Sequence, residues 1–127
     1  MQAQNLAVVK GLVSVAWADG RVSNEETQVI EALLQAFSAM PSEAHELRRF
    51  AATPRSLADV PLQDLGYAAR RQLLLHAVFI TYVDGEQHDK EKQLLDELVV
   101  LLEIPPLEAK ELLREADERA KALVPLL

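Results

Sequence analysis

Apolar residues recur along the chain at helical spacing, and no segment shows the two-residue alternation that is typical of a strand. The first such segment presents five apolar residues on one face: Leu6, Val9, Val13, Ala16 and Trp17. A second segment, residues 73–83, is apolar almost all round, which predicts a buried helix. Both segments stop at an Asp-Gly pair, where glycine can adopt the left-handed conformation that ends a helix. We therefore predict an all-α fold.

Each apolar segment is followed by an amphipathic segment and then by a proline. The two amphipathic stripes consist of Val29, Ile30, Leu33, Leu34 and Phe37, and of Leu94, Leu95, Leu98, Val99 and Leu102. Pro41 and Pro106 then mark the start of a third helix in each half, because proline is tolerated in the first helical turn. Between the halves, residues 53–66 contain two prolines and predict a connector with one short extra helix.

The two halves repeat each other at an offset of 65 residues. Residues 13–49 align with residues 78–114 without a gap, and twelve of the thirty-seven positions are identical. We therefore predict one compact domain over residues 1–127, with two three-helix repeats related by a pseudo-twofold axis and six or seven helices in all. Repeat one covers about residues 6–52, the connector about 53–66 and repeat two about 67–123.

Charge and composition exclude several classes of function. The chain carries 13 basic and 20 acidic residues, a net charge of −7, which disfavours a nucleic-acid-binding domain because such a domain needs a basic face. It has no cysteine, so it forms no disulfide, thiolate nucleophile or Cys-ligated metal centre. Five arginines gather in residues 48–71. We favour compensation by nearby acids over an anion site at Arg48/Arg49 or Arg70/Arg71.

We expect neither a membrane span nor an export signal in the chain. Its longest uncharged run, residues 72–83, has twelve residues, whereas a bilayer span needs about twenty. No basic residue precedes the apolar stretch near the N-terminus, and Lys10 interrupts it, so we expect no signal peptide. We expect a cytoplasmic protein that is not transmembrane.

The repeated turn, Asp-Gly followed by glutamate, has two interpretations. In the structural one, Ser23 and Glu26 form a capping box at the start of a helix, and Asp89 caps the corresponding helix in repeat two. In the functional one, the turn resembles the last eight positions of an EF-hand loop. The first two ligand positions of that loop would then fall on apolar or aromatic residues: Val15, Trp17, Ile80 and Tyr82. Each turn therefore offers about three or four protein oxygens, and calcium binding would be weak.

The motifs Trp-Ala-Asp-Gly-Arg-Val-Ser-Asn-Glu-Glu and Tyr-Val-Asp-Gly-Glu-Gln-His-Asp-Lys-Glu resemble those of the tellurite-resistance protein B (TerB) family. The resemblance covers about residues 6–120 and implies a compact, acidic, all-helical domain of the bacterial tellurite and chemical-stress response. It also implies that divalent cations bind at the acidic turns, through Asp19 and Glu26 and through Asp84 and Glu91. Repeat two departs from the family pattern at Gln87 and His88, which puts the geometry or metal preference of that turn in doubt. The domain is reused in other proteins, so the fold does not by itself give the phenotype.

No pattern in the chain predicts an enzyme. The three histidines are scattered, no serine lies in a nucleophile motif, and the four glycines make no phosphate-binding loop. We expect His76 to be a hydrogen-bonded histidine in the core or at its boundary, and Trp17 and Tyr82 to fill the core. We therefore predict a non-enzymatic stress-response module that uses no organic cofactor and binds Ca²⁺ or another divalent cation weakly. The alternative is a protein–protein adaptor with purely structural turns, which uses its helix stripes or residues 122–127.

Under either interpretation we expect a protein partner, with the membrane surface as one place where the two could meet. The oligomeric state stays open.

Overall fold

The computed structural model of the chain describes residues 2–17, 20, 22–83 and 89–123, and it gives only the backbone of residues 89–91 and 123. These residues form α-helices and two short 3₁₀ helices, with no strand among them, so the predicted all-α class is confirmed. The α-helices are α1 (Ala3–Ala16), α2 (Asn24–Ala36), α3 (Pro41–Ala51), α4 (Tyr67–Tyr82), α5 (Asp89–Leu101) and α6 (Pro106–Leu123). The 3₁₀ helices are η2 (Leu57–Asp59) and η3 (Leu62–Asp64).

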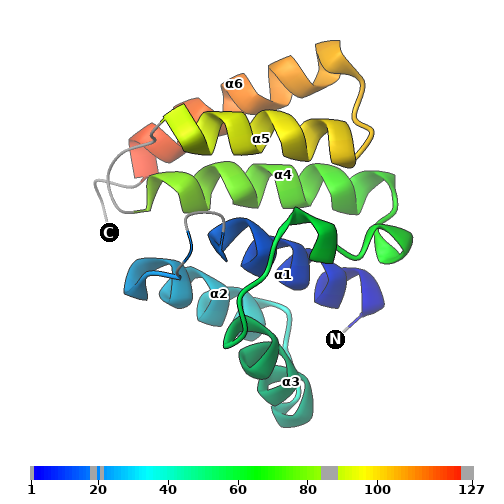
Figure 1. Cartoon of the computed structure of the whole chain (residues 1–127), viewed down its shortest axis with the longest axis vertical. Helices are drawn as coiled ribbons and strands as arrows, with labels where there is room; N and C mark the ends of the chain where they lie inside the picture. The colour runs from blue at the N-terminus through cyan, green and yellow to red at the C-terminus, as the bar shows by residue number, and fades with distance from the viewer. Residues whose placement is uncertain (1, 18–19, 21, 84–88, 124–127) are drawn as a thin grey trace.

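The first helices of the two repeats, α1 and α4, pack against each other in the middle of the molecule (Figure 1). Helices α2 and α3 contact α1, whereas α5 and α6 contact α4 on the opposite side (Figure 1). In Figure 1, α1 and α4 both run from right to left, so their C-terminal ends point the same way. The segments that carry the two acidic turns therefore begin at the same end of the central helix pair.

The core is centred on this helix pair, as the apolar segments predicted. Nine of the fourteen residues of α1 are buried, and Leu73, Leu74 and Ala77 of α4 are completely inaccessible. Gly11 lets the two helices approach closely, since a Cβ atom at this position would lie 2.6 Å from Cδ2 of Leu73. His76 stands at the position that corresponds to Gly11, and it is half-buried at the edge of the core.

The helix ends follow the 65-residue offset of the sequence repeat. Helix α2 ends at Ala36 and α5 ends at Leu101. Two residues later, Ser38 and Glu103 adopt the left-handed conformation, with φ angles of 54° and 57°. The same local geometry therefore ends the second helix of each repeat, although neither residue is glycine. The pseudo-twofold axis itself stays a prediction.

The connector differs from the single short helix that the sequence predicted, because η2 and η3 both form within it. Pro61 lies between them and has no N–H group, so one continuous helix would lose a hydrogen bond there. Val60 and Leu65, which follow the two 3₁₀ helices, are buried in the main core. The connector is therefore attached to the domain by its own apolar residues.

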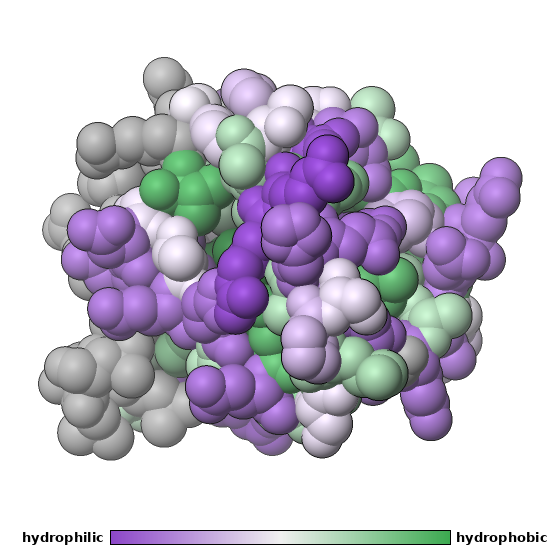
Figure 2. Space-filling view, turned by 90° about the horizontal axis from the view of Figure 1, so that it is seen from below, coloured by the Kyte–Doolittle hydropathy of each residue, from purple (hydrophilic) through white to green (hydrophobic). Residues whose placement is uncertain are grey.

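The surface carries both polar and apolar side chains, and the side formed by α2 and α3 is mostly polar. Figure 2 shows the molecule from that side, and hydrophilic side chains cover most of it, with small hydrophobic patches between them. Among the described residues, no helix has the length and the apolar character that crossing a bilayer requires.

Candidate functional site

The acidic turn of repeat one leads into α2 through a complete capping box. The backbone N–H of Ser23 donates to Oε1 of Glu26 at 2.9 Å, and the backbone N–H of Glu26 donates to Oγ of Ser23 at 3.1 Å. The carboxylate of Glu26 therefore lies at the positive end of the α2 dipole. This confirms the capping interpretation of the first turn.

Gly20 occupies the bend between α1 and α2. Its φ angle is 92°, and its N–H donates to the carbonyl oxygen of Trp17 at 2.9 Å. The predicted left-handed glycine is therefore present in repeat one. Its counterpart Gly85 lies outside the described residues.

The structure places one of the four candidate metal ligands completely, namely Glu26. Asp19 and Asp84 lie outside the described residues, and Glu91 belongs to α5 although its side chain is not described. Within the described part of the chain, no group of three or more Asp, Glu or His side chains is arranged to hold a metal ion. The described residues alone therefore do not make a metal centre, and the four-residue assignment stays a prediction.

The aromatic residue two positions before each turn connects the end of the first helix to the third helix. In repeat one, Nε1 of Trp17 donates to the carbonyl oxygen of Ala51 at 2.9 Å. In repeat two, the hydroxyl of Tyr82 donates to Oδ1 of Asp117. These bonds fix the helix ends from which the turns start. The sequence predicted that both rings fill the core, but it did not predict their partners on the third helices.

Asp117 is held in its charged form by the groups around it. Burial raises its pKa, but the hydrogen bonds from Tyr82 and Lys121 and the positive charges of Lys121 and Lys92 outweigh this effect. The net pKa of Asp117 therefore lies below its ordinary value.

The described contacts do not support an anion site in the arginine-rich centre, because four of its five arginines have acceptors within the chain. Arg55 donates to the carbonyl oxygen of Phe50 at 3.0 Å. Arg48 donates to both carboxylate oxygens of Glu31, at 2.8 and 2.9 Å. Arg71 makes two hydrogen bonds to Glu108. Arg70 donates to backbone carbonyls. The predicted compensation by nearby acids is therefore confirmed for Arg48 and Arg71, whereas the hydrogen bonds of Arg70 go to the backbone.

Glu108 connects the starts of α4 and α6. Its counterpart in repeat one, Glu43, accepts the backbone N–H of Met40 at 2.8 Å, whereas Pro105 at the corresponding position has no N–H to donate. The Glu108 carboxylate instead accepts hydrogen bonds from Arg71 and from the hydroxyl of Tyr67.

These bonds predict a contribution of Glu108 to acid stability. The hydrogen bonds from Arg71 and Tyr67 lower the pKa of Glu108 from 4.5 to about 2. Because the unfolded chain binds this proton more readily, the stabilisation is complete above about pH 4.5 and is lost as the pH falls towards 2. We expect Glu108→Gln to flatten the pH dependence of the unfolding free energy in this window, measured by urea denaturation at a series of pH values. An exposed acid that makes no such contacts, Glu115, serves as the control through Glu115→Gln, and equal slopes for the two variants would contradict the assignment.

A model of the family described as "Tellurite resistance protein TerB" matches residues 5–114. The match covers most of the chain and includes both acidic turns and all or part of each of the six α-helices. No curated protein and no solved structure matches the chain.

Proposed function

The chain belongs to the tellurite resistance protein TerB family, and from this premise we propose that it is a cytoplasmic, non-enzymatic module of the tellurite and chemical-stress response whose acidic turns bind a divalent cation weakly. The proposed ligands are Asp19 and Glu26 in one turn and Asp84 and Glu91 in the other. With so few protein oxygens in each turn, water completes the coordination shell of a hard cation such as Ca²⁺.

The observation that carries this proposal is the repetition of the glutamate at the same helix position. Helices α2 and α5 begin 65 residues apart, at Asn24 and Asp89, and the third residue of each is a glutamate. In α2 the capping box holds that glutamate at the helix start. The preceding helices, α1 and α4, end in the same direction (Figure 1). This common direction of α1 and α4 supports the proposal that the two turns act as matching half-sites on one side of the domain.

Titration with CaCl₂ tests this proposal. We expect the backbone amides of residues 18–27 and 83–92 to shift in ¹H–¹⁵N spectra with half-saturation near 10⁻⁴–10⁻³ M, the range on the order of weak extracellular calcium modules. The double variant Asp19→Asn with Asp84→Asn should lose these shifts. The control variant, Asp64→Asn with Glu115→Gln, removes two exposed acids outside the turns and should keep them. Amides that stay unchanged at millimolar Ca²⁺ in the wild-type chain would rule out cation binding by the turns.

The second candidate function is a protein–protein adaptor, which the complete capping box favours because it gives Ser23 and Glu26 a role without a metal. Under this alternative, Asp19→Ala with Asp84→Ala lowers the melting temperature by the same amount with and without Ca²⁺. Under the cation proposal, Ca²⁺ raises the melting temperature of the wild type and leaves that of the double variant unchanged.

A further inference from the structure

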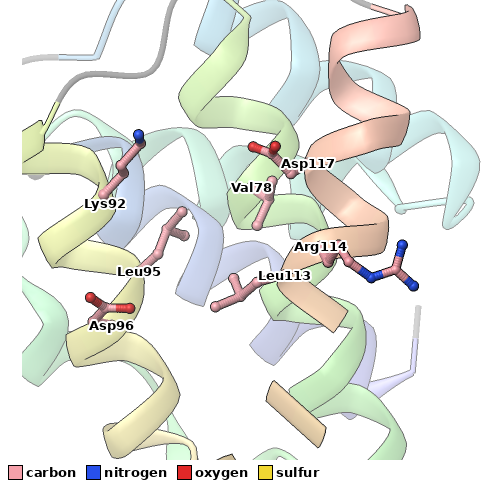
Figure 3. A pocket seen from close by; sticks show the side chains of 7 residues that line it. All are labelled: Val78, Lys92, Leu95, Asp96, Leu113, Arg114 and Asp117. Atoms are coloured by element: carbon pink, nitrogen blue, oxygen red, sulfur yellow. The ribbon is translucent and has the colours of Figure 1, made fainter. Parts of the chain in front are cut away.

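A groove runs between α5 and α6, with α4 at its base (Figure 3). It encloses about 330 Å³. Its apolar floor consists of Val78, Leu95 and Leu113, and its charged lining residues are Lys92, Asp96, Arg114 and Asp117. Such a combination of an apolar floor and charged edges is typical of sites that accept an amphipathic peptide.

Repeat one contains the corresponding groove, between α2 and α3, which has the same volume of about 330 Å³ but carries an ion pair across it. Ile30 lies at the position of Leu95, and Glu31 and Arg48 lie at the positions of Asp96 and Leu113. The guanidinium of Arg48 reaches across from α3 and donates to both oxygens of Glu31 on α2. This groove therefore already holds an arginine opposite its acid.

The groove of repeat two lacks this ion pair. Leu113 replaces the arginine, and within the described part of the chain no basic side chain forms an ion pair with Asp96. Arg114 is bound on its own helix, to Glu111 at 2.9 Å and to Glu118 at 3.1 Å, and Figure 3 shows its guanidinium pointing away from α5.

The remaining charges around the groove do not replace the missing arginine. The positive charge of Lys92 helps to keep Asp117 ionised, and Lys121 forms an ion pair with the same carboxylate at 3.1 Å. Residues 72–127 carry six basic and twelve acidic residues, so this half of the chain is net negative, while the groove lining itself has two basic and two acidic side chains. An incoming cation is therefore attracted to this side of the molecule.

We propose that the α5–α6 groove is the docking site for a cationic amphipathic segment of a protein partner. An apolar side chain of that segment packs between Leu95 and Leu113, and an arginine of the segment donates to Asp96 as Arg48 donates to Glu31. This docking does not rest on cation binding by the acidic turns. Its failure and the failure of the calcium titration are therefore separate results.

The probe is an acetylated and amidated alanine-based helical peptide of about fifteen residues that carries one leucine and one arginine four positions apart. We expect saturable shifts of the backbone amides of residues 92–96 and 113–117, with a dissociation constant on the order of 10⁻⁴ M. Peptides in which glutamate replaces the arginine, or alanine the leucine, should bind about fivefold more weakly or worse.

Variants of the chain provide the decisive comparison. Asp96→Asn should weaken binding of the arginine peptide about fivefold, whereas Asp64→Asn in η3 should leave it unchanged. Leu113→Arg restores the arrangement of repeat one. It should weaken peptide binding about tenfold or more, because the new arginine fills the groove and forms an ion pair with Asp96. The reverse change, Arg48→Leu, should leave Glu31 without its arginine partner and add a second set of shifts in the α2–α3 groove.

Four results would overturn the proposal. Two are the absence of saturable shifts in the groove, and equal affinity of the wild type and Asp96→Asn for the arginine peptide. The third is a change in the same amides when the wild type is diluted without peptide, since a second copy of the chain would then fill the groove. The fourth is a difference in the same amides between the full chain and a chain ending at Leu123, both without peptide. Residues 124–127 would then be the occupant.

Discussion

Leu73→Ala is expected to lower the free energy of unfolding by about 2–5 kcal/mol, among the largest effects of any single substitution in this chain. Leu73 is completely buried and lies where α4 packs against α1, opposite Gly11. Truncation would leave a cavity between the two repeats, and surrounding atoms on both helices would lose their contacts. Urea denaturation followed by circular dichroism measures the change. The control is Leu107→Ala, the same substitution at a side chain that is 84% exposed, for which we expect a change within about 0.5 kcal/mol.

The contact between Gly11 and Leu73 predicts that substitutions at these two positions have non-additive effects on the free energy of unfolding. Gly11→Ala alone should cost about 1–3 kcal/mol, because the new methyl group would meet the Leu73 side chain in a packed core. In the double variant, Gly11→Ala with Leu73→Ala, that methyl group enters the space left by the leucine. The double variant should therefore lose less stability than the sum of the two single variants. Additive losses would show that Gly11 and Leu73 do not pack directly against each other.

The helices could be predicted from the sequence because their apolar residues recur at helical spacing and because each stretch has a visible end. The Asp-Gly pairs and the prolines marked these ends, and the offset of 65 residues repeated them. The sequence predicted one short helix in the connector, but it did not predict two 3₁₀ helices, since a segment of three residues is too short to show a period. The apolar residues Leu57, Val60, Leu62 and Leu65 pack on the core, but isolated apolar residues in a loop are ambiguous in the sequence.

The contacts of the candidate site could be predicted where the two partners are close in the sequence. Ser23 and Glu26 are three residues apart, so their spacing alone indicated the capping box that the structure shows. The bond between Tyr82 and Asp117 joins residues 35 positions apart, and no local pattern shows that their helices face each other there. The α5–α6 groove is likewise formed by residues that lie far apart in the sequence. The replacement of Arg48 by Leu113 is visible in the aligned repeats, but the loss of a partner for Asp96 becomes visible only when the helices are packed.

Arg70 illustrates how an arginine that resembles an anion ligand in the sequence can have a structural role. Its Nε donates to the carbonyl oxygen of Leu65 at 2.8 Å, and its Nη2 donates to that of Leu62 at 3.1 Å, both in the connector. Its Nη1 donates to the carbonyl oxygen of Leu102, just after α5, at 2.9 Å. One guanidinium thus joins the connector, α4 and the end of α5. Backbone carbonyls have no sequence signature, so these partners could not be predicted.

Arg70→Ala is therefore expected to lower the free energy of unfolding by about 2–4 kcal/mol, because it removes three charge-assisted hydrogen bonds at a side chain that is 23% exposed. Arg70→Lys should recover less than half of this loss, since an ammonium group cannot present a planar fork to three separate carbonyls. Arg49→Ala is the control, because Arg49 is an exposed arginine of the same central cluster, and we expect it to change stability by less than about 0.5 kcal/mol. Urea denaturation measures all three variants, and amide hydrogen exchange of residues 57–66 reports whether the connector loosens. Full stability in Arg70→Lys would show that the positive charge alone, without the guanidinium geometry, holds the connector in place.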